Sequence, residues 1–475
     1  MPAFIYRFSR DLRIDDHAGL SCAAKYGEII PVLLLDSPMH ERLAASPRRA
    51  AFFCSAVAAL DRQLRERGSR LIVRRGRAGP ILKAIARATD SLGVAWSASY
   101  DRMGVQHDQR LQSELEEAGL RAMVVHDAPA LPPEQTTAER RGGDGEGYRA
   151  FVPYFMVWRK LAVPSYDSPL LLRFAQMELQ SEALPNCDEF QSHESAPLVG
   201  PNLATAQLRA FLHGPALQYS VAANVPADER TSRLSADLSF GTIAARTVVR
   251  ETLKRCDDPF LLTEERASLR MFLRSLARRD FFLQLSWYHT ADDEPLQAKM
   301  RGFTFARSHA GLNAWSLGET GYPLVDAGMR QLRETGWMHP RVRAIVASFL
   351  CFDLGVDWRV GYAQWEKLLI EDEPSLAIGN WQWVAGVGAD LAAYPRIYNP
   401  RKQAGRFDPR GDYVRRWIPE LSGLIGSRFT NSRRTSEQIE LPFFNATVYP
   451  QPILDHEIAA REFLVRYSTH VAKER

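Results

Sequence analysis

Residues 29–35 read Ile-Ile-Pro-Val-Leu-Leu-Leu, and this run decides the fold of the first part of the chain. A run without a single polar side chain is typical of a strand that is buried on both faces of a parallel sheet. Four further short strands are expected around it: Ala3–Tyr6, Leu71–Val73, Val94–Ser97 and Ala122–Val125. Amphipathic stretches such as Arg48–Arg67 and Pro80–Ala88 alternate with these strands. Such alternation predicts a doubly wound parallel sheet of Rossmann-like type.

The composition is that of a globular protein with more than one domain. The chain has 475 residues, of which 45% are hydrophobic and 24% charged, so disorder is excluded as the dominant state. It contains no run of 18 apolar residues, and residues 1–13 become charged too early for a secretory signal. We therefore expect a cytoplasmic protein without a membrane partner.

Several common site types are not supported by the sequence. The first 130 residues contain neither GxGxxG nor GxxxxGK[ST], so they predict no nucleotide site of those kinds. The five cysteines are scattered and form no CxxC pair, which argues against a disulfide framework, a zinc site or an iron–sulfur cluster. The net charge of +4 permits an acidic partner without demanding one.

The remainder of the chain has a different character. Residues 129–200 are rich in Pro, Gly, Ser and Asp and predict a long connection with a short helix near Phe151–Leu161. From residue 201 onward the pattern is helical, with long periodic segments at Glu264–Trp287, Leu324–Glu334 and Val342–Phe352. The predicted fold class is therefore α/β plus all-α, with an α/β domain at 1–128, a linker at 129–200 and a helical domain at 201–475.

The segment Thr231-Ser232-Arg233-Leu234-Ser235 places three hydroxyls and one guanidinium ahead of a helix. Hydroxyls at such a position commonly cap the free N–H groups of the helix. The alternative is a phosphate cradle, in which hydroxyls and N-terminal amides hold a pyrophosphate. The segment alone leaves both interpretations open.

Several longer motifs follow in a fixed order: Gly318–Arg330, Thr335–His339, Asp357–Arg359, Glu371–Glu373, Asn380–Trp383, Tyr394–Pro400, Gln403, Phe407–Pro409 and Tyr449–Ile453. With these motifs, and with Arg10–Arg13 near the start, the chain resembles the photolyase/cryptochrome flavoprotein family over nearly its whole length. The resemblance implies an N-terminal α/β domain, a linker and a C-terminal helical domain that binds FAD.

The resemblance also implies which residues contact FAD. The predicted set is Tyr219, Thr231, Ser232, Arg233, Leu234 and Ser235 toward the phosphates and ribityl chain, Trp337 and Arg343 at the ring system, and the segment Glu371, Asp372 and Glu373. Relatives carry Asp at the first and third positions of this last segment. We expect Glu371 to pair with Arg343, because a buried carboxylate requires a partner.

Four positions depart from the pattern of the repair enzymes. Where relatives grip the lesion with a Glu and a Trp, this chain has Ser275 and Arg278, and Pro340 replaces an Asn that contacts the lesion. Proline has neither an amide N–H nor a polar side chain with which to replace that contact. Ala377 replaces the Asn, Asp or Cys that relatives place against the central flavin ring, so control of flavin protonation must differ.

The electron relay of the family is altered as well. Trp381 and Trp358 match its inner two tryptophans, whereas the outermost position is Phe305, which is far harder to oxidise. The relay either ends early or leaves through another aromatic residue, for which the candidates are Trp287, Tyr288 and Trp383.

The resemblance implies DNA as partner, and it implies a monomer without a metal. The predicted DNA or substrate positions are Ser275, Arg278, Arg279, Pro340, Arg341, Arg396 and Gln403, followed by a basic stretch at 401–416 that is either a phosphate-binding surface or a solvated charged face. Met103 and Gly104 stand where a folate-type antenna is bound in relatives, which argues against that antenna and leaves other types open. Two functions are consistent with the sequence: a light-driven photolyase that splits pyrimidine dimers, with repair weak or lost, or a cryptochrome-like photoreceptor without repair.

Overall fold

The computed structural model describes residues 2–140, 146–161, 172–195, 197–289, 294–305, 311–389, 394–422 and 449–473. The chain forms two compact units. The first contains residues 1–217, 232–292 and 370–376, and the second contains residues 218–231, 293–369 and 377–475. This division differs from the predicted boundaries at 128 and 200, because the helices between 232 and 289 pack with the α/β part of the chain. The predicted linker 129–200 lies partly outside the described residues.

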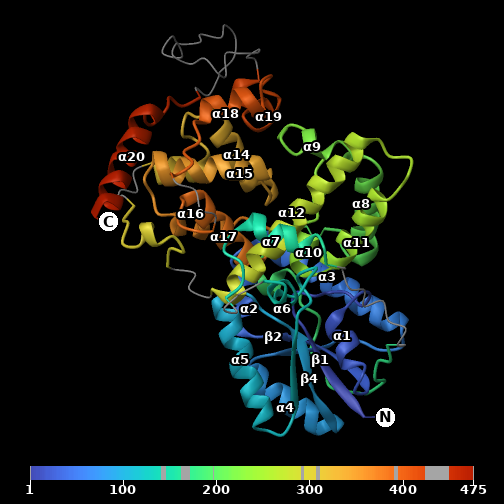
Figure 1. Ribbon diagram of the computed structural model, residues 1–475. Coiled ribbons are helices and arrows are strands. Elements are labelled where there is room, and N and C mark those ends of the chain that lie inside the picture. Colours follow the sequence, from blue (N-terminus) through green and yellow to red (C-terminus); the bar gives the residue numbers. More distant parts are fainter. Residues whose placement is uncertain are drawn as a thin grey trace. The chain divides into compact units, whose positions relative to one another are not determined.

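The first unit is built on five parallel strands in the order β3-β2-β1-β4-β5 (Figure 1). All five strands predicted from apolar runs are present, each within three residues of its expected ends. Their bounds are β1 Ala3–Phe8, β2 Glu28–Leu35, β3 Ile72–Arg75, β4 Ser91–Ser97 and β5 Arg121–Val125.

Helices cover both faces of this sheet, as a doubly wound fold requires. Alternate residues of β1 point to opposite faces: Phe4 and Tyr6 share a core with helix α3, whereas Ile5 shares another with helices α4 and α5. The helices and 3-10 turns of this unit are α1 Ala18–Ala23, α2 Ser37–Ala44, α3 Pro47–Glu66, α4 Ala78–Thr89, α5 Arg102–Glu116, α6 Pro133–Ala138, α7 Phe151–Trp158, η1 Asp188–Phe190, α8 Pro201–His213, η2 Pro215–Gln218, α10 Ser235–Phe240, α11 Ala245–Cys256 and α12 Thr263–Tyr288.

The second unit is helical throughout its described residues, around one large aromatic and aliphatic core. Its elements are α9 Tyr219–Ala222, η3 Ala298–Met300, α13 Leu312–Leu317, α14 Pro323–Thr335, α15 Pro340–Ser348, η4 Phe349–Asp353, α16 Trp358–Glu366, α17 Pro374–Ala385, α18 Pro400–Phe407, α19 Asp412–Trp417, η5 Pro419–Leu421 and α20 His456–Lys473. The first three residues of α17 belong to the first unit. Prolines begin α14, α15 and α18, where the missing N–H would have no partner inside the helix.

Buried ion pairs link the sheet of the first unit to its helices. Asp127, directly after β5, accepts hydrogen bonds from Arg13 at 2.7 and 2.9 Å and from Arg246 of α11 at 2.8 Å. It also accepts from the backbone N–H of Ala18, and Arg246 contacts Asp16 at 3.2 Å. Burial raises the pKa of Asp127, but the neighbouring cations outweigh this and hold that pKa well below its usual value.

Candidate functional site

The segment Thr231–Ser235 leads into α10, but its hydroxyls do not serve as the cap of that helix. The N-cap residue is Leu234, which makes no side-chain cap bond, so the capping interpretation is not supported. The Oγ1 atom of Thr231 is buried and has no hydrogen-bond partner among the described residues. Arg233 adopts φ of 56°, a left-handed conformation that is costly for a non-glycine residue and is often retained at ligand sites. A phosphate or hydroxyl group of a cofactor would satisfy the Thr231 hydroxyl.

The acidic segment 371–373 is held in the first unit by arginines. The carboxylate of Asp372 accepts a hydrogen bond from Arg42 and lies 3.9 Å from Arg49. Its backbone carbonyl accepts from Arg10 at 2.9 Å, and its N–H donates to Ser239. Although burial raises the pKa of Asp372, Arg42, Arg49 and Arg10 lower it well below its usual range. These contacts give Asp372 a structural role in anchoring the segment.

The two glutamates beside it have different surroundings. Glu373 lies 3.5 Å from Arg279, and burial raises its pKa more than the nearby arginines lower it. The carbonyl of Glu371 accepts a hydrogen bond from Arg49 at 3.4 Å. Glu371 belongs to the first unit and Arg343 to the second, so their pairing stays a prediction.

Three of the predicted lesion positions lie on α12, and they do not share one environment. Ser275 is exposed, and its hydroxyl donates to the carbonyl of Met271 at 3.3 Å. The guanidinium of Arg278 lies 4.4 Å from the ring centroid of Phe151 in α7. Arg279 is buried and donates inward to the carbonyl of Ala128 at 2.7 Å. The structure therefore gives no support to a direct DNA contact by Arg279.

The second unit holds the predicted ring-system residues and one lesion position, Pro340, around the start of α15. Pro340 is exposed at the first position of that helix, where it donates no hydrogen bond. Trp337 packs edge-on against His339 at 6.1 Å between ring centroids. Arg343 donates through Nε to the carbonyl of Met338 at 2.8 Å, which fixes the start of its side chain. Tyr219, at the start of α9, is half-buried in the same unit.

Trp381 belongs to a cluster of three buried tryptophans that the sequence did not reveal. Its ring centroid lies 4.6 Å from that of Trp365 and 6.5 Å from that of Trp315. Trp315 and Trp365 are stacked at 6.2 Å with an angle of 7° between their planes. A side chain at Gly361 would collide with the Trp381 ring, so glycine is needed there for the ring to lie against α16. The spacing of seven residues between Trp358 and Trp365, which puts both on one face of α16, was the available signal.

The other two relay positions have different neighbours. Trp358 lies at the first turn of α16 with the Arg359 guanidinium 4.9 Å from its ring centroid. Phe305 is only 6% exposed and packs against Phe303 and Phe463. Arg359 also pairs with the carboxylate of Asp357 at 3.1 Å, so the positive charge beside the Trp358 ring is balanced by a negative one.

The three residues predicted as alternative exits of the electron relay lie in different parts of the molecule. Trp287 is in the first unit and packs against Tyr100 and His126. Tyr288 is the last residue of α12 in the same unit. Trp383 lies in the second unit, two residues after Trp381. Ala377 is half-buried on the same helix, α17, and offers no side-chain hydrogen bond.

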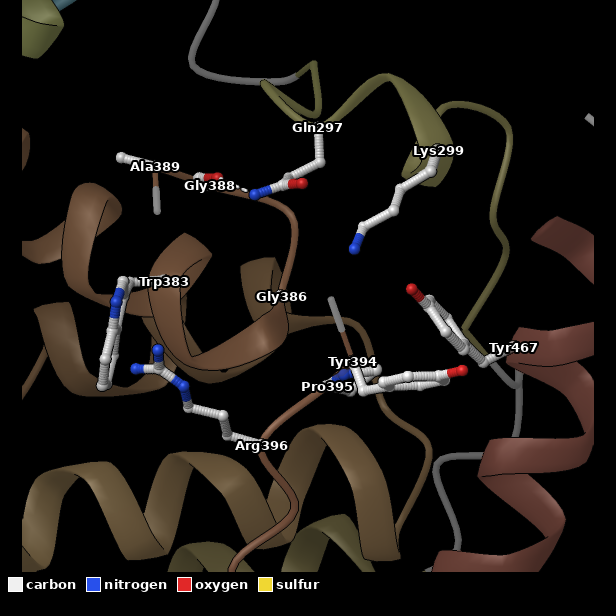
Figure 2. A pocket seen from close by; sticks show the side chains of 10 residues that line it. All are labelled: Gln297, Lys299, Trp383, Gly386, Gly388, Ala389, Tyr394, Pro395, Arg396 and Tyr467. Atoms are coloured by element: carbon white, nitrogen blue, oxygen red, sulfur yellow. Dashed lines mark hydrogen bonds between the residues drawn. The ribbon is translucent and has the colours of Figure 1, made fainter. Parts of the chain in front are cut away.

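A pocket of the second unit combines cationic and aromatic side chains (Figure 2). The Arg396 guanidinium lies 5.1 Å from the ring centroid of Trp383, and Figure 2 shows the two side chains together at one end of the pocket. Lys299 points into it from η3, facing Tyr467 of α20. Cations and aromatic faces side by side are the combination that binds single nucleotides and their phosphates.

The remaining predicted DNA residues are partly engaged within the unit. Arg341 donates to Asn224 at 2.5 Å, and its guanidinium lies 4.8 Å from the ring centroid of Phe407. Gln403 is half-buried on α18. In the basic stretch that follows, three arginines pair with carboxylates at 2.6 to 2.8 Å: Arg410 and Arg415 with Asp412, and Arg416 with Glu229. This pairing favours the solvated charged face over a phosphate-binding surface for those three residues.

The structure also bears on metals, thiols and membranes. Over the described ranges, no group of three or more His, Cys, Asp or Glu side chains could hold a metal ion. All five cysteines are free thiols. Among the helices that the structure describes, none is long and apolar enough to cross a bilayer.

Comparison with known proteins identifies the family. Sequence models of two domains match the chain: DNA photolyase at residues 4–170, and the FAD binding domain of DNA photolyase at 272–469. A deoxyribodipyrimidine photo-lyase of Halobacterium salinarum is 34% identical, over 96% of each chain.

Two solved structures are similar over almost the whole chain. A bacterial class III photolyase from Agrobacterium tumefaciens has a TM-score of 0.85 at 30% identity, covering 100% of this chain and 98% of the other. A cryptochrome from Synechocystis has a TM-score of 0.86 at 25% identity, covering 98% and 99%.

The fold and the matched domains define a flavoprotein with an N-terminal α/β sheet and a helical FAD-binding domain. The chain belongs to the photolyase/cryptochrome family.

Proposed function

We propose that this protein is an FAD-dependent, light-driven DNA photolyase with weakened repair of cyclobutane pyrimidine dimers. The observation that carries the proposal is the near full-length likeness to a deoxyribodipyrimidine photo-lyase, together with the retained Trp381. We expect a cytoplasmic monomer that acts on DNA.

The described residues fit FAD. The buried Thr231 hydroxyl lacks a partner that a phosphate or ribityl oxygen would provide, and the segment 371–373 is anchored by arginines rather than left to solvent. When bound, FAD supplies light absorption and the electron that splits the dimer. The proposed contacts are the predicted residues except Asp372, whose bonding is satisfied by Arg42 and Arg49.

The chain's own residues contribute exclusion of water and a route for electrons. The tryptophan cluster (Trp315, Trp365 and Trp381) is buried, and its rings are within 6.5 Å of one another between centroids. We propose that electrons reach the flavin through this cluster as well as through Trp358. Trp315 donates its N–H to the carbonyl of Val346, and the Trp365 N–H has no partner among the described residues, so neither ring has a base to accept a proton. An electron hole on the cluster therefore keeps its positive charge and recombines readily with the electron on the flavin.

Lesion binding is the weak part of the site. A cyclobutane dimer would lose a carboxylate contact at Ser275 and an aromatic wall at Arg278, at about 1–3 kcal/mol each. Pro340 removes a third contact. Binding energy lost from the lesion lowers repair even when the cofactor is intact.

A cryptochrome-like photoreceptor is the second candidate. The same three substitutions favour it, as does the similarity to a cryptochrome structure. Photoreduction without any dimer repair would be its signature.

One sample tests the proposal. Fresh protein is scanned for flavin absorption, photoreduced anaerobically with a mild thiol, and given an oligonucleotide that carries a thymine dimer, with a dark sample as control. We expect flavin bands and slow repair, and we expect Ser275→Glu with Arg278→Trp to raise repair at least tenfold, about 1.4 kcal/mol. Absence of flavin, with no uptake of added FAD, would contradict the proposal. Photoreduction without repair, unchanged in the double variant, would favour the cryptochrome alternative.

A further inference from the structure

Helix α12 carries four arginines at intervals of four residues: Arg266, Arg270, Arg274 and Arg278. We propose that this arginine ladder binds the phosphates of a single-stranded polynucleotide. The inference rests on DNA being the substrate in the proposed function. It adds a new contact surface, of which only Arg278 is also a predicted lesion residue.

The geometry of the ladder suits successive phosphates. Four residues of α-helix rise about 6 Å and turn about 40° beyond a full turn, so the ladder spans about 18 Å and winds about a third of the way round α12. Phosphates of one strand in a duplex are about 3.4 Å apart along the axis, and they separate further when the strand is extended. Guanidinium groups about 6 Å apart along α12 therefore suit the successive phosphates of an extended strand laid along the helix.

Two rungs are held in place by an aromatic shelf. The Arg274 guanidinium lies 5.4 Å from the ring centroids of both Phe151 and Phe155, and Arg278 lies over Phe151 at 4.4 Å. The two phenylalanines stack on each other at 5.7 Å. A guanidinium that stacks by its face keeps its N–H edge available for a phosphate. Holding the side chain in advance also reduces the entropy lost on binding.

Three of the four arginines of the ladder are not neutralised by acids. Arg270 and Arg274 are exposed, and within the described ranges neither of them, nor Arg266, forms a salt bridge with a carboxylate. Arg266 donates one bond to the carbonyl of Asp258, and its Nε has no partner among the described residues. The arginines at 410, 415 and 416 differ from these, because each forms an ion pair with a carboxylate. An unneutralised row of arginines attracts a polyanion.

A strand is favoured over an anionic membrane as the occupant. The inner face of α12, with Leu269, Phe272, Leu273 and Leu276, is buried in the core of the unit. A helix that binds a bilayer must turn its apolar face to the lipid, and the apolar face of α12 is already packed against the protein core. Exposed Arg159 and Lys160, directly after α7, add positive charge to the element that carries the aromatic shelf.

The test measures binding of undamaged fluorescent oligothymidylate to the FAD-loaded protein in the dark, over a range of salt concentrations. Arg270→Gln with Arg274→Gln should weaken binding roughly tenfold and reduce the slope of log K against log salt by about 1.4, since each lost phosphate contact reduces it by about 0.7. The matched control is Arg62→Gln with Arg87→Gln, which removes two exposed helical arginines from α3 and α4. It should leave the slope unchanged.

A second variant separates positioning from charge. Phe155→Leu keeps all four arginines but removes one ring from the shelf, so it should weaken binding by a smaller factor with the slope unchanged. Thermal melting checks that each variant is folded.

Three outcomes would overturn the inference. One is an unchanged slope in the folded Arg270/Arg274 variant while the wild type binds DNA, which leaves the proposed function standing. Another is loss of binding to vesicles with 20% phosphatidylserine in that variant while its oligonucleotide binding is normal, which would assign the ladder to membranes. The last is no DNA binding by the wild type at all, which would defeat the inference and the DNA part of the proposed function together.

Discussion

Each unit contains a buried aspartate, and Asp127 and Asp326 are satisfied in opposite ways. In the first, Asp127 is surrounded by cations, with Arg13 and Arg246 both almost fully buried beside it. In the second, the buried carboxyl of Asp326 accepts hydrogen bonds from neutral donors, the N–H groups of Thr320 and Gly321 and the hydroxyl of Tyr449. The pKa of Asp127 is consequently lowered, whereas burial raises that of Asp326. The comparison shows one buried carboxylate held by charge and another held by neutral hydrogen-bond donors.

Asp127→Asn should have the largest effect. The substitution leaves two buried guanidinium groups without their shared counter-charge, at about 3–5 kcal/mol in the free energy of unfolding. Urea titration at pH 7 measures it. Arg62→Gln, which removes an exposed arginine from α3, is the control and should stay within about 0.5 kcal/mol.

The pH dependence of that loss has a definite sign. Because the pKa of Asp127 is lower in the folded state, its contribution is present above the unfolded value of about 3.9 and disappears as pH falls through the folded value. The difference between wild type and variant should therefore shrink on acidification. For Asp326 the folded pKa is raised, so protonation on acidification favours the folded state. If the Asp127 variant were equally destabilised at all pH values, the ion-pair account would be wrong.

Trp365→Phe tests the role of the tryptophan cluster in the second unit. Removing the ring 4.6 Å from Trp381 should lower the yield of steady-state photoreduction about tenfold, equivalent to ~1.4 kcal/mol. In the dark, near-ultraviolet circular dichroism should lose the signal of stacked indoles, which reports on the cluster independently of the flavin. Trp417→Phe, which removes a half-buried tryptophan of α19 outside the cluster, is the matched control. A normal yield in a folded Trp365 variant would show that electrons reach the flavin through Trp358 and not through the cluster.

Phe305→Trp should have the smallest effect. A tryptophan there restores the outer relay position, but it must enter a space bounded by Phe303 and Phe463, and overpacking costs about 1–3 kcal/mol. We expect a small gain in photoreduction yield and a lower melting temperature. A gain as large as the Trp365→Phe loss would make the outer position, rather than the cluster, the limiting step.

The sequence predicted the parts of the molecule that depend on local pattern. The run at 29–35 and its neighbours identified all five strands, because burial on both faces leaves a continuous apolar signature. The order of motifs indicated the family and the FAD-binding domain before any geometry was known.

Contacts between distant residues could not be predicted in this way. Nothing local to Arg13, Asp127 or Arg246 marks them as partners, since charged residues usually stay at the surface. Likewise, Asp372 was assigned to the cofactor by its place in a motif, whereas Arg42 and Arg49 lie more than 300 residues earlier in the chain. The stacking of Trp315 on Trp365 depends on how α13 and α16 pack, which no single segment encodes.

The path of the chain has a consequence for how this protein can be divided. The first unit is completed only by residues 370–376, which arrive after the chain has built much of the second unit. A fragment that ends at residue 292 would lack Asp372 and leave the buried Arg49 facing an empty position. Neither unit is thus a cassette that a gene fusion or a single protease cut could release intact. A ribosome making the chain in order must deliver residues 218–231 and 293–369 of the second unit before the first can close.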